Sequence, residues 1–318
     1  MENILEVLNL NKDFRGFSLD NVSFTLEKGC IMGFIGQNGA GKTTTIKLIL
    51  NAIGKSSGQI KIFEKDNVKE EIFVKSHIGY VPAEDYFIST SNVHNHAKAL
   101  SLFYDNLSND IFNNYVSKWR IPLDQKIGEF SKGMKTKAMF ALAFAHQPNL
   151  LILDEPTAGL DPVARIEILD ILREFVSDGE KSVFFSTHIT SDLDKIADYI
   201  TLIHDGKIIE SLSIDKLEEK YIVLTGGMEE LKGLENQFVG IRKGEIAFEG
   251  LILRENAHEF FRDIKGTNPS VENLLTFNIW GCDKVETNLA LVDIYKRAQQ
   301  ISLRRWLKKI NIGDNSKY

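Results

Sequence analysis

The chain has 318 residues, of which 43% are hydrophobic, so it is long enough for one large domain with a smaller appended region. Its 38 Lys and Arg residues against 44 Asp and Glu residues give a net charge of −6, which argues against a surface devoted to nucleic acid, and no nucleic-acid partner is expected. Cys30 and Cys282 lack metal-site or disulfide spacing, and the longest nearly apolar run, 139–145, cannot cross a bilayer. We therefore expect a soluble chain in a reducing compartment.

The N-terminal third begins with alternating apolar residues, as in ILEVLNL and LDNVSFTLEKG, which predict antiparallel strands that end in a turn at Lys28 and Gly29. The run CIMGFIG, 30–36, is continuously apolar and predicts a central strand that is covered on both faces. Apolar residues then recur at helical spacing from Lys42 to Ile53, with Gly54 as the stop. Strand, glycine-rich loop and helix therefore follow one another.

The middle of the chain continues the alternation of strands and helices. Two further strands are predicted from SGQIKIF and HIGYVP, and an inserted helical subdomain over about 88–147. Next come a buried strand LLILDEP, a helix over 162–176, a strand SVFFSTH and a hairpin YITLIHDGKIIE. This order predicts an α/β fold with a mostly parallel sheet, which fills a first domain over 1–213.

The pattern changes after residue 213. An accessory α+β region is predicted over 214–282, with a hairpin FVGIRKGEIAFEGLIL and a short helix NPSVENLLTF opened by Asn268 and Pro269. The tail, 283–318, reads as a basic amphipathic helix, which either contacts an anionic membrane surface or packs its apolar stripe on the accessory region or a dimer mate. Within it, Lys296, Arg297, Arg304, Arg305, Lys308 and Lys309 occur with no acidic residue among them.

The loop GQNGAGKTT satisfies the pattern G-x-x-x-x-G-K-[ST] between the predicted strand and helix. Glycines let successive backbone N–H groups turn inward toward phosphate oxygens, and the following helix N-terminus adds its positive dipole end. A lysine there reaches the β and γ phosphates, and a hydroxyl ligates Mg²⁺. The pattern indicates a P-loop that binds a nucleoside triphosphate. Its candidate residues are Gly36, Gln37, Asn38, Gly39, Ala40, Gly41, Lys42, Thr43 and Thr44.

Two acidic residues and a histidine follow later strands. Asp154 and Glu155 end the strand LLILDEP, where one carboxylate can serve the metal and the other can act as base for an attacking water. We assign Asp154 to the metal and Glu155 to the water. His188 follows VFFST and would sense the γ phosphate, although each of the three residues could also mark a plain strand end.

The helix that starts after Ser131 carries positive charge at an unfavourable place. Ser131 is a good cap and Gly133 keeps the first turn open, but Lys132, Lys135 and Lys137 lie where the helix dipole is already positive. Each such charge costs about 0.3–1 kcal/mol when it is exposed. Either an anion binds there, or this is an ordinary solvated helix start.

Five ordered motifs, GQNGAGKTT, FSKGM, LLILDEP, AGLD and STH, resemble the nucleotide-binding subunit of an ATP-binding cassette (ABC) transporter. The resemblance implies a P-loop ATPase with an antiparallel β subdomain. It implies that Ser131, Lys132 and Gly133 contact the γ phosphate of ATP bound to a second such subunit. Asp161 would belong to the D-loop, and the Phe14 ring would stack on adenine. Implied partners are a second ATPase subunit and a transmembrane permease that holds the chain at the inner membrane face.

The chain departs from the family pattern at two places. Lys132 occupies the first glycine position of the signature, and Ala83 stands where a glutamine is usual, so Glu84 is our candidate substitute for that metal contact. The signature, YVPAEDYF and the C-terminal extension are most similar to exporter ATPases of the Ytr and bacitracin-resistance types. A soluble ABC ATPase without a transport role, or a regulatory subunit that binds ATP without hydrolysis, stays open.

Overall fold

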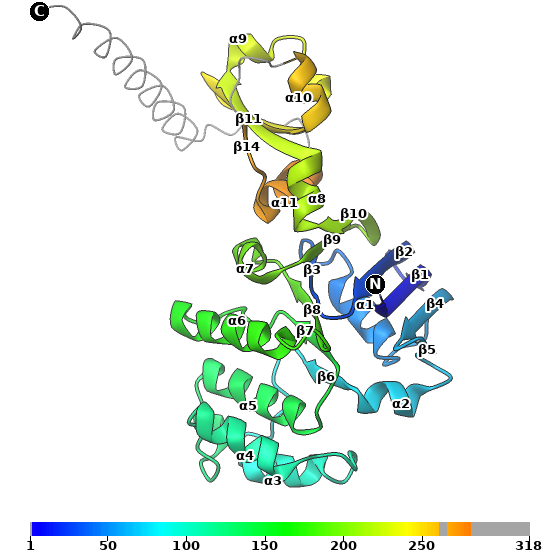
Figure 1. Ribbon diagram of the computed structural model, residues 1–318, viewed down its shortest axis with the longest axis vertical. Helices are drawn as coiled ribbons and strands as arrows, with labels where there is room; N and C mark the ends of the chain where they lie inside the picture. The colour runs from blue at the N-terminus through cyan, green and yellow to red at the C-terminus, as the bar shows by residue number, and fades with distance from the viewer. Residues whose placement is uncertain (1, 261–265, 281–318) are drawn as a thin grey trace, which may run out of the picture. The chain divides into compact units, whose positions relative to one another are not determined.

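The computed structural model describes residues 2–260 and 266–280 (Figure 1). The chain forms two compact units, Met1–Ile214 and Asp215–Tyr318, and each is described by itself. The predicted basic tail, 283–318, lies outside the described residues, so its membrane contact stays a prediction.

A six-stranded sheet forms the centre of the first unit, with the strand order β10-β9-β3-β8-β7-β6. Its neighbours are paired in parallel except β10, which is antiparallel to β9. Every residue of β3, β7 and β8 is buried, and for β3 the continuous apolar run predicted this. The strands are β3 (Ile31–Ile35), β6 (Ile78–Val81), β7 (Leu150–Asp154), β8 (Ser182–Thr187), β9 (Tyr199–His204) and β10 (Lys207–Ser213).

Both faces of this sheet are covered. One face shares a core with α1 (Lys42–Ile49) and a four-stranded antiparallel sheet. On the other face the side chain of Leu193 lies against Gly33, where a Cβ would be only 2.5 Å from it. That leucine belongs to α7 (Thr190–Ile196), which packs beside α6 (Pro162–Val176). The antiparallel sheet contains β2 (Phe17–Glu27), β1 (Asn3–Phe14), β4 (Ser57–Ile62) and β5 (Lys65–Asp66), in that order.

Helix α1 ends at Ile49 and not at Ile53, so the sequence prediction placed its end four residues too late. Asn51 adopts a left-handed backbone conformation with φ of 50°. The side chain of Asn67 donates hydrogen bonds to the carbonyls of Leu48 and Ile49, at 2.9 and 3.0 Å. Because this buried amide satisfies the last carbonyls, the helix can stop one turn early.

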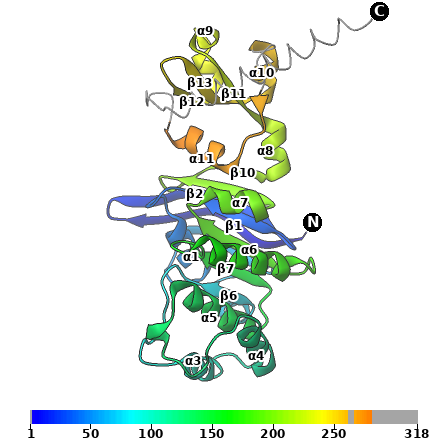
Figure 2. The same cartoon turned by 90° about the vertical axis from the view of Figure 1, so that its left-hand side faces the viewer.

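The expected helices between 88 and 147 are present and share their own apolar core. In both views, α3, α4 and α5 lie together at the end of the first unit that is opposite β10 (Figures 1 and 2). The side chains of Asn92, Ser108 and Ser131 each accept a backbone N–H and cap one of these helices. The elements of this helical region are α3 (Val93–Leu100), α4 (Asn109–Lys118), η1 (Ile127–Glu129) and α5 (Lys132–Ala145), and α2 (Glu71–Ser76) precedes them in the chain.

The described part of the second unit is built on an antiparallel sheet of order β12-β13-β11-β14. The expected hairpin is confirmed, since Lys243 pairs with Phe248. The last helix begins at Val271, because the Ser270 hydroxyl accepts the N–H of Asn273, and not at the expected Asn268-Pro269. The elements are α8 (Ile214–Lys220), β11 (Tyr221–Gly227), α9 (Met228–Leu231), η2 (Glu235–Gln237), β12 (Phe238–Lys243), β13 (Ala247–Leu253), α10 (Arg254–Phe260), β14 (Gly266–Thr267) and α11 (Val271–Trp280).

Within the residues that the structure describes, no helix combines the length and the apolar character needed to span a bilayer.

Candidate functional site

The candidate residues come together because three neighbouring parallel strands end at one edge of the sheet. Strand β3 leads into the glycine-rich loop, β7 ends at Asp154 and β8 leads to His188. Ile35 pairs with Thr187, and Asp154 pairs with Ser186. Since these strands run in the same direction and in register, the loop, the acidic pair and the histidine meet at their carboxyl ends.

Two glycines of the loop have no room for a side chain. A Cβ on Gly36 would stand 2.4 Å from the carbonyl oxygen of Ile203. Gly41 has φ of 113°, and its Cβ would meet Leu19 at 2.6 Å and the Phe17 ring at 3.1 Å. Both positions therefore require glycine for the loop to turn tightly into α1.

The Lys42 side chain points back into this loop. It is 6% exposed, and its Nζ donates to the carbonyls of Gly36 at 2.8 Å and Gln37 at 3.3 Å. The same nitrogen lies 3.3 Å from Oε1 of Glu155. These three partners match the three protons of an ammonium group, so the lysine is held at the centre of the site.

Thr43 and Asp154 form an oxygen pair suited to Mg²⁺. The Thr43 hydroxyl donates to Oδ2 of Asp154 at 2.9 Å, while the Ser186 hydroxyl donates to Oδ1 at 2.7 Å. Asp154 is 2% exposed, so its orientation is fixed. Magnesium uses few protein ligands, typically one or two oxygens beside substrate phosphates and water, and these residues fit that requirement. The described residues contain no group of three or more His, Cys, Asp or Glu that could hold a metal by itself.

Glu155 lies between the lysine and His188. Its Oε2 accepts hydrogen bonds from Nδ1 of His188 at 2.7 Å and from the backbone N–H of the same residue at 3.2 Å. Its backbone has φ of 51°, a conformation that is uncommon outside glycine, and its N–H donates to the Ser186 carbonyl at 2.9 Å. The carboxylate is thus oriented by both neighbours.

A cavity of about 220 Å³ lies beside Lys42, Thr43 and Glu155. Phe17 lines it, whereas Phe14, the aromatic residue that the sequence singled out, does not. The two residues pair across the β1–β2 hairpin, with ring centroids 6.4 Å apart, and Lys12 lies over the Phe14 ring. Sequence reasoning missed Phe17, although its place opposite Phe14 was a usable signal. The lining residues are Phe17, Asn38, Gly39, Gly41, Lys42, Thr43, Thr44 and Glu155.

Comparison with known proteins identifies this arrangement. Residues 19–158 match the family model described as ABC transporter. The bacitracin transport ATP-binding protein BcrA of Bacillus licheniformis is 32% identical over 225 residues, which is 69% of this chain and 73% of that protein. The chain belongs to the ABC transporter family. Within that family it is an ATP-binding protein, as the sequence motifs predicted.

Other ABC proteins agree with this assignment. The ABC transporter ATP-binding protein YtrB of Bacillus subtilis is 29% identical and aligns with 87% of this chain and 95% of its own length. A solved structure of an ATP-binding subunit of an ABC transporter has a TM-score of 0.62 and 27% identity, and covers 68% of this chain and 92% of its own. The expected fold, an ABC ATPase with a parallel sheet, antiparallel sheets and helices, is confirmed.

The ABC signature segment and the D-loop lie outside the P-loop cavity. Ser131 accepts the backbone N–H of Met134 at 3.2 Å, which caps α5. Asp161 accepts the N–H groups of Val163 and Ala164, both at 3.0 Å, which caps α6 and lowers the pKa of its carboxyl group. Both residues are exposed.

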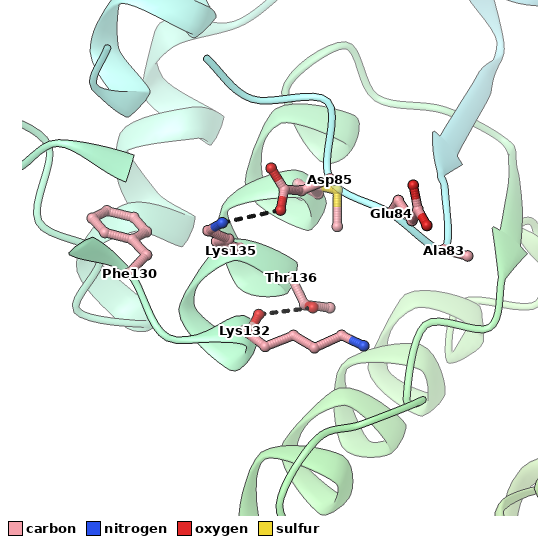
Figure 3. Close-up of a pocket in the computed structure, with 8 residues that line it drawn as sticks. Ala83, Glu84, Asp85, Phe130, Lys132, Lys135 and Thr136 are labelled. Carbon is pink, nitrogen blue, oxygen red and sulfur yellow. Dashed lines mark hydrogen bonds and ion pairs between the residues drawn. The ribbon is translucent and has the colours of Figure 1, made fainter. Parts of the chain in front are cut away.

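Glu84, the third candidate metal ligand, forms no hydrogen bond with Thr43 or Asp154 among the described residues. Glu84 lines a second cavity of about 440 Å³, and Thr43 and Asp154 do not line it (Figure 3). A role for Glu84 at the metal therefore stays a proposal. The cavity is lined by Ala83, Glu84, Asp85, Phe130, Lys132, Lys135, Thr136 and Met139.

Proposed function

We propose that the chain hydrolyses ATP and that this hydrolysis drives transport by a separate transmembrane permease. One observation carries the proposal: the carboxylate of Glu155 lies 3.3 Å from the P-loop lysine and 2.7 Å from His188. Phosphoryl transfer to water needs a group that orients the nucleophile and accepts its proton, beside cations that neutralise the phosphates. Glu155 and Lys42 are these two groups.

Each residue has a defined task in this mechanism. Lys42 exchanges its present partners for β- and γ-phosphate oxygens when ATP binds, and the backbone N–H groups of the loop hold the same phosphates. Glu155 then accepts a proton from the attacking water at Oε1. His188 keeps the carboxylate in place through Oε2. Mg²⁺, held by Thr43 and Asp154, would supply further neutralisation of the phosphate charge.

The partners follow from the geometry and from the relatives. Ser131 and Gly133 do not line the P-loop cavity of their own chain, so we propose that they meet ATP in a second ABC ATPase subunit, of the same or another chain. Relatives are named for bacitracin transport and for lantibiotic transport, the latter being SrtF of Streptococcus pyogenes at 32% identity and 99% of its length. We propose export, with the chain at the inner membrane face through its permease.

The exchange Glu155→Gln tests the catalytic assignment. It keeps the hydrogen bond from His188 but removes the base, so phosphate release should fall at least a hundredfold while ATP still binds. The control is Glu174→Gln, because Glu174 is an exposed glutamate that pairs only with the exposed Lys118 among its described contacts. It should hydrolyse ATP at the normal rate. A Glu155→Gln protein with normal turnover would show that another group is the base.

The proposed dimer has its own test. A cysteine at Asn38, which lines the P-loop cavity, and a cysteine at Ser131 should crosslink between two chains when Glu155→Gln protein is loaded with ATP. The pair should not crosslink without nucleotide. If no crosslink forms in protein that binds ATP, the two sites do not meet.

A further inference from the structure

The three lysines at the start of α5 do not share one environment. Lys135 forms an ion pair with Asp85 at 3.1 Å, and Lys137 forms one with Glu167 at 2.5 Å. These carboxylates of the same chain offset the unfavourable position of two of the three charges. Among the described residues, no carboxylate forms an ion pair with Lys132. The charge of this lysine, which departs from the ABC signature, is therefore not offset by any carboxylate that the structure describes, and its place at the start of α5 needs another explanation.

The end of the Lys132 side chain lies against Gly159. Figure 3 shows it extending away from the pair formed by Lys135 and Asp85. A Cβ on Gly159 would stand 2.9 Å from the Lys132 Nζ, 3.6 Å from its Cδ and 3.7 Å from its Cε. The side chain thus covers the bare Cα of a glycine whose φ is 69°.

Gly159 belongs to the short loop that joins Glu155 to α6. The N–H of Ala158 donates to the Glu155 carbonyl at 3.1 Å, and the N–H of Leu160 donates to the Thr157 carbonyl at 3.3 Å. The loop is therefore a hydrogen-bonded continuation of the backbone that carries Glu155, and Gly159 lies four positions after that residue.

Two neighbouring contacts make the same connection between α5 and α6. Gly133, next to Lys132, lies so close to Ala164 that a Cβ would be 3.3 Å from the alanine Cβ. One turn further along α5, Lys137 pairs with Glu167. Three contacts therefore connect the first turns of α5 to the segment 159–167, and the Lys132–Gly159 contact is the one nearest to Glu155 in the sequence.

We propose that Lys132 is a positioning residue for the hydrolysis reaction: it holds the 157–161 loop, and through it Glu155, from within the same chain. The inference rests on the proposed function of Glu155. It gives Lys132 a task that differs from contact with a phosphate in a second subunit. The two roles predict different kinetics, because positioning of the base affects turnover and phosphate contact affects ATP binding.

A double-mutant cycle tests the contact. Wild type, Lys132→Ala, Gly159→Ala and the double variant are unfolded in urea as full-length proteins. The strain of alanine at φ of 69° is present in both backgrounds and cancels. Gly159→Ala changes the unfolding equilibrium constant by some factor in each background. This factor should be about threefold smaller in the Lys132→Ala background than in the wild-type background, which is the size of coupling that residues in contact show. Equal responses in the two backgrounds would overturn the contact.

Gly179 provides the matched control. Its φ of 72° resembles that of Gly159, but a Cβ there would meet no atom within 4 Å. Gly179→Ala should therefore cost the same stability with and without Lys132.

Steady-state kinetics test the role. Lys132→Ala should lower kcat about tenfold and leave KM for ATP within about twofold, and Lys132→Arg should restore most of the turnover. A raised KM at unchanged kcat would overturn positioning in favour of phosphate contact, and unchanged kinetics would overturn both. If the proposed function is wrong, the results differ from these. The wild type would release no phosphate, or Glu155→Gln would release it at the wild-type rate. The double-mutant cycle in urea would still test the contact between Lys132 and Gly159.

Discussion

Asn67 determines where the P-loop helix ends, and its replacement gives a sharp test of the fold. The residue is 2% exposed and lies just after β5. Its amide nitrogen donates to the carbonyls of Leu48 and Ile49, and its amide oxygen is 3.4 Å from Lys55. Both donated bonds are buried, so water cannot replace them.

Asn67→Ala should lower the free energy of unfolding by about 2–3 kcal/mol. Each lost hydrogen bond is worth about 1 kcal/mol net, and the Ile49 carbonyl adds to the cost because it loses its donor, whereas the Leu48 carbonyl keeps the N–H of Asn51 at 3.1 Å. Asn67→Asp keeps the shape but turns the carboxylate oxygens toward those carbonyl oxygens. It should therefore cost more than the alanine, about 4 kcal/mol at neutral pH.

Urea unfolding followed by circular dichroism measures both values. The control is Asn114→Ala, an exposed position on α4 that should change the free energy of unfolding by no more than about 0.5 kcal/mol. If Asn67→Asp unfolds at the same urea concentration as the wild type, the amide does not cap α1, and the account of the early helix end is wrong.

Three further predictions concern buried or site-lining groups. Arg165 lies 3.8 Å from Asp192, which is fully buried and has no hydrogen-bond partner for either carboxylate oxygen among the described residues. Arg165→Leu should therefore lower the free energy of unfolding in urea by about 3 kcal/mol, and adding Asp192→Asn should restore at least half of that loss. Burial lowers the pKa of His146, so its contribution to stability is present above the unfolded pKa of about 6.5 and is lost as the pH falls. The free energy of unfolding measured from pH 8 to pH 5 should therefore decline less for His146→Gln than for the wild type. Phe17→Ala should weaken binding of a fluorescent ATP analogue about tenfold. Phe14→Ala should weaken it less, because of these two residues only Phe17 lines the cavity. A larger effect of Phe14→Ala would show that Phe14 stacks on the base.

The sequence predicted the elements whose signals are local. Helix α6 begins and ends at the expected residues, with Asp161 and Pro162 marking its start, and β3 and β7 were recognised from their short apolar runs. Their parallel pairing then placed Lys42, Asp154 and Glu155 together. These parts of the site needed only the expectation of a mostly parallel sheet, because each residue ends or follows one of its strands.

The sequence could not supply partners that lie far along the chain. The cap of α1 comes from Asn67, which lies eighteen residues beyond the helix end at Ile49, and no local sequence pattern predicts it. Lys135 and Lys137 looked like a site for an external anion, but they pair with Asp85 and Glu167, which arrive from other elements. Propensity and capping patterns report on neighbours in sequence, whereas such ion pairs depend on how the elements pack.

The shared register of β3, β8 and β7 also determines where this chain can change its length. A one-residue deletion within β7 would replace Asp154 by its neighbour and turn the side chain to the opposite side of the sheet, because successive residues of a strand alternate. The connection between α3 and α4 joins two helices and no strand, so it carries no such constraint. We therefore expect length variants to stay active when residues are added between α3 and α4, and to fail when a single residue is removed from any of these three strands.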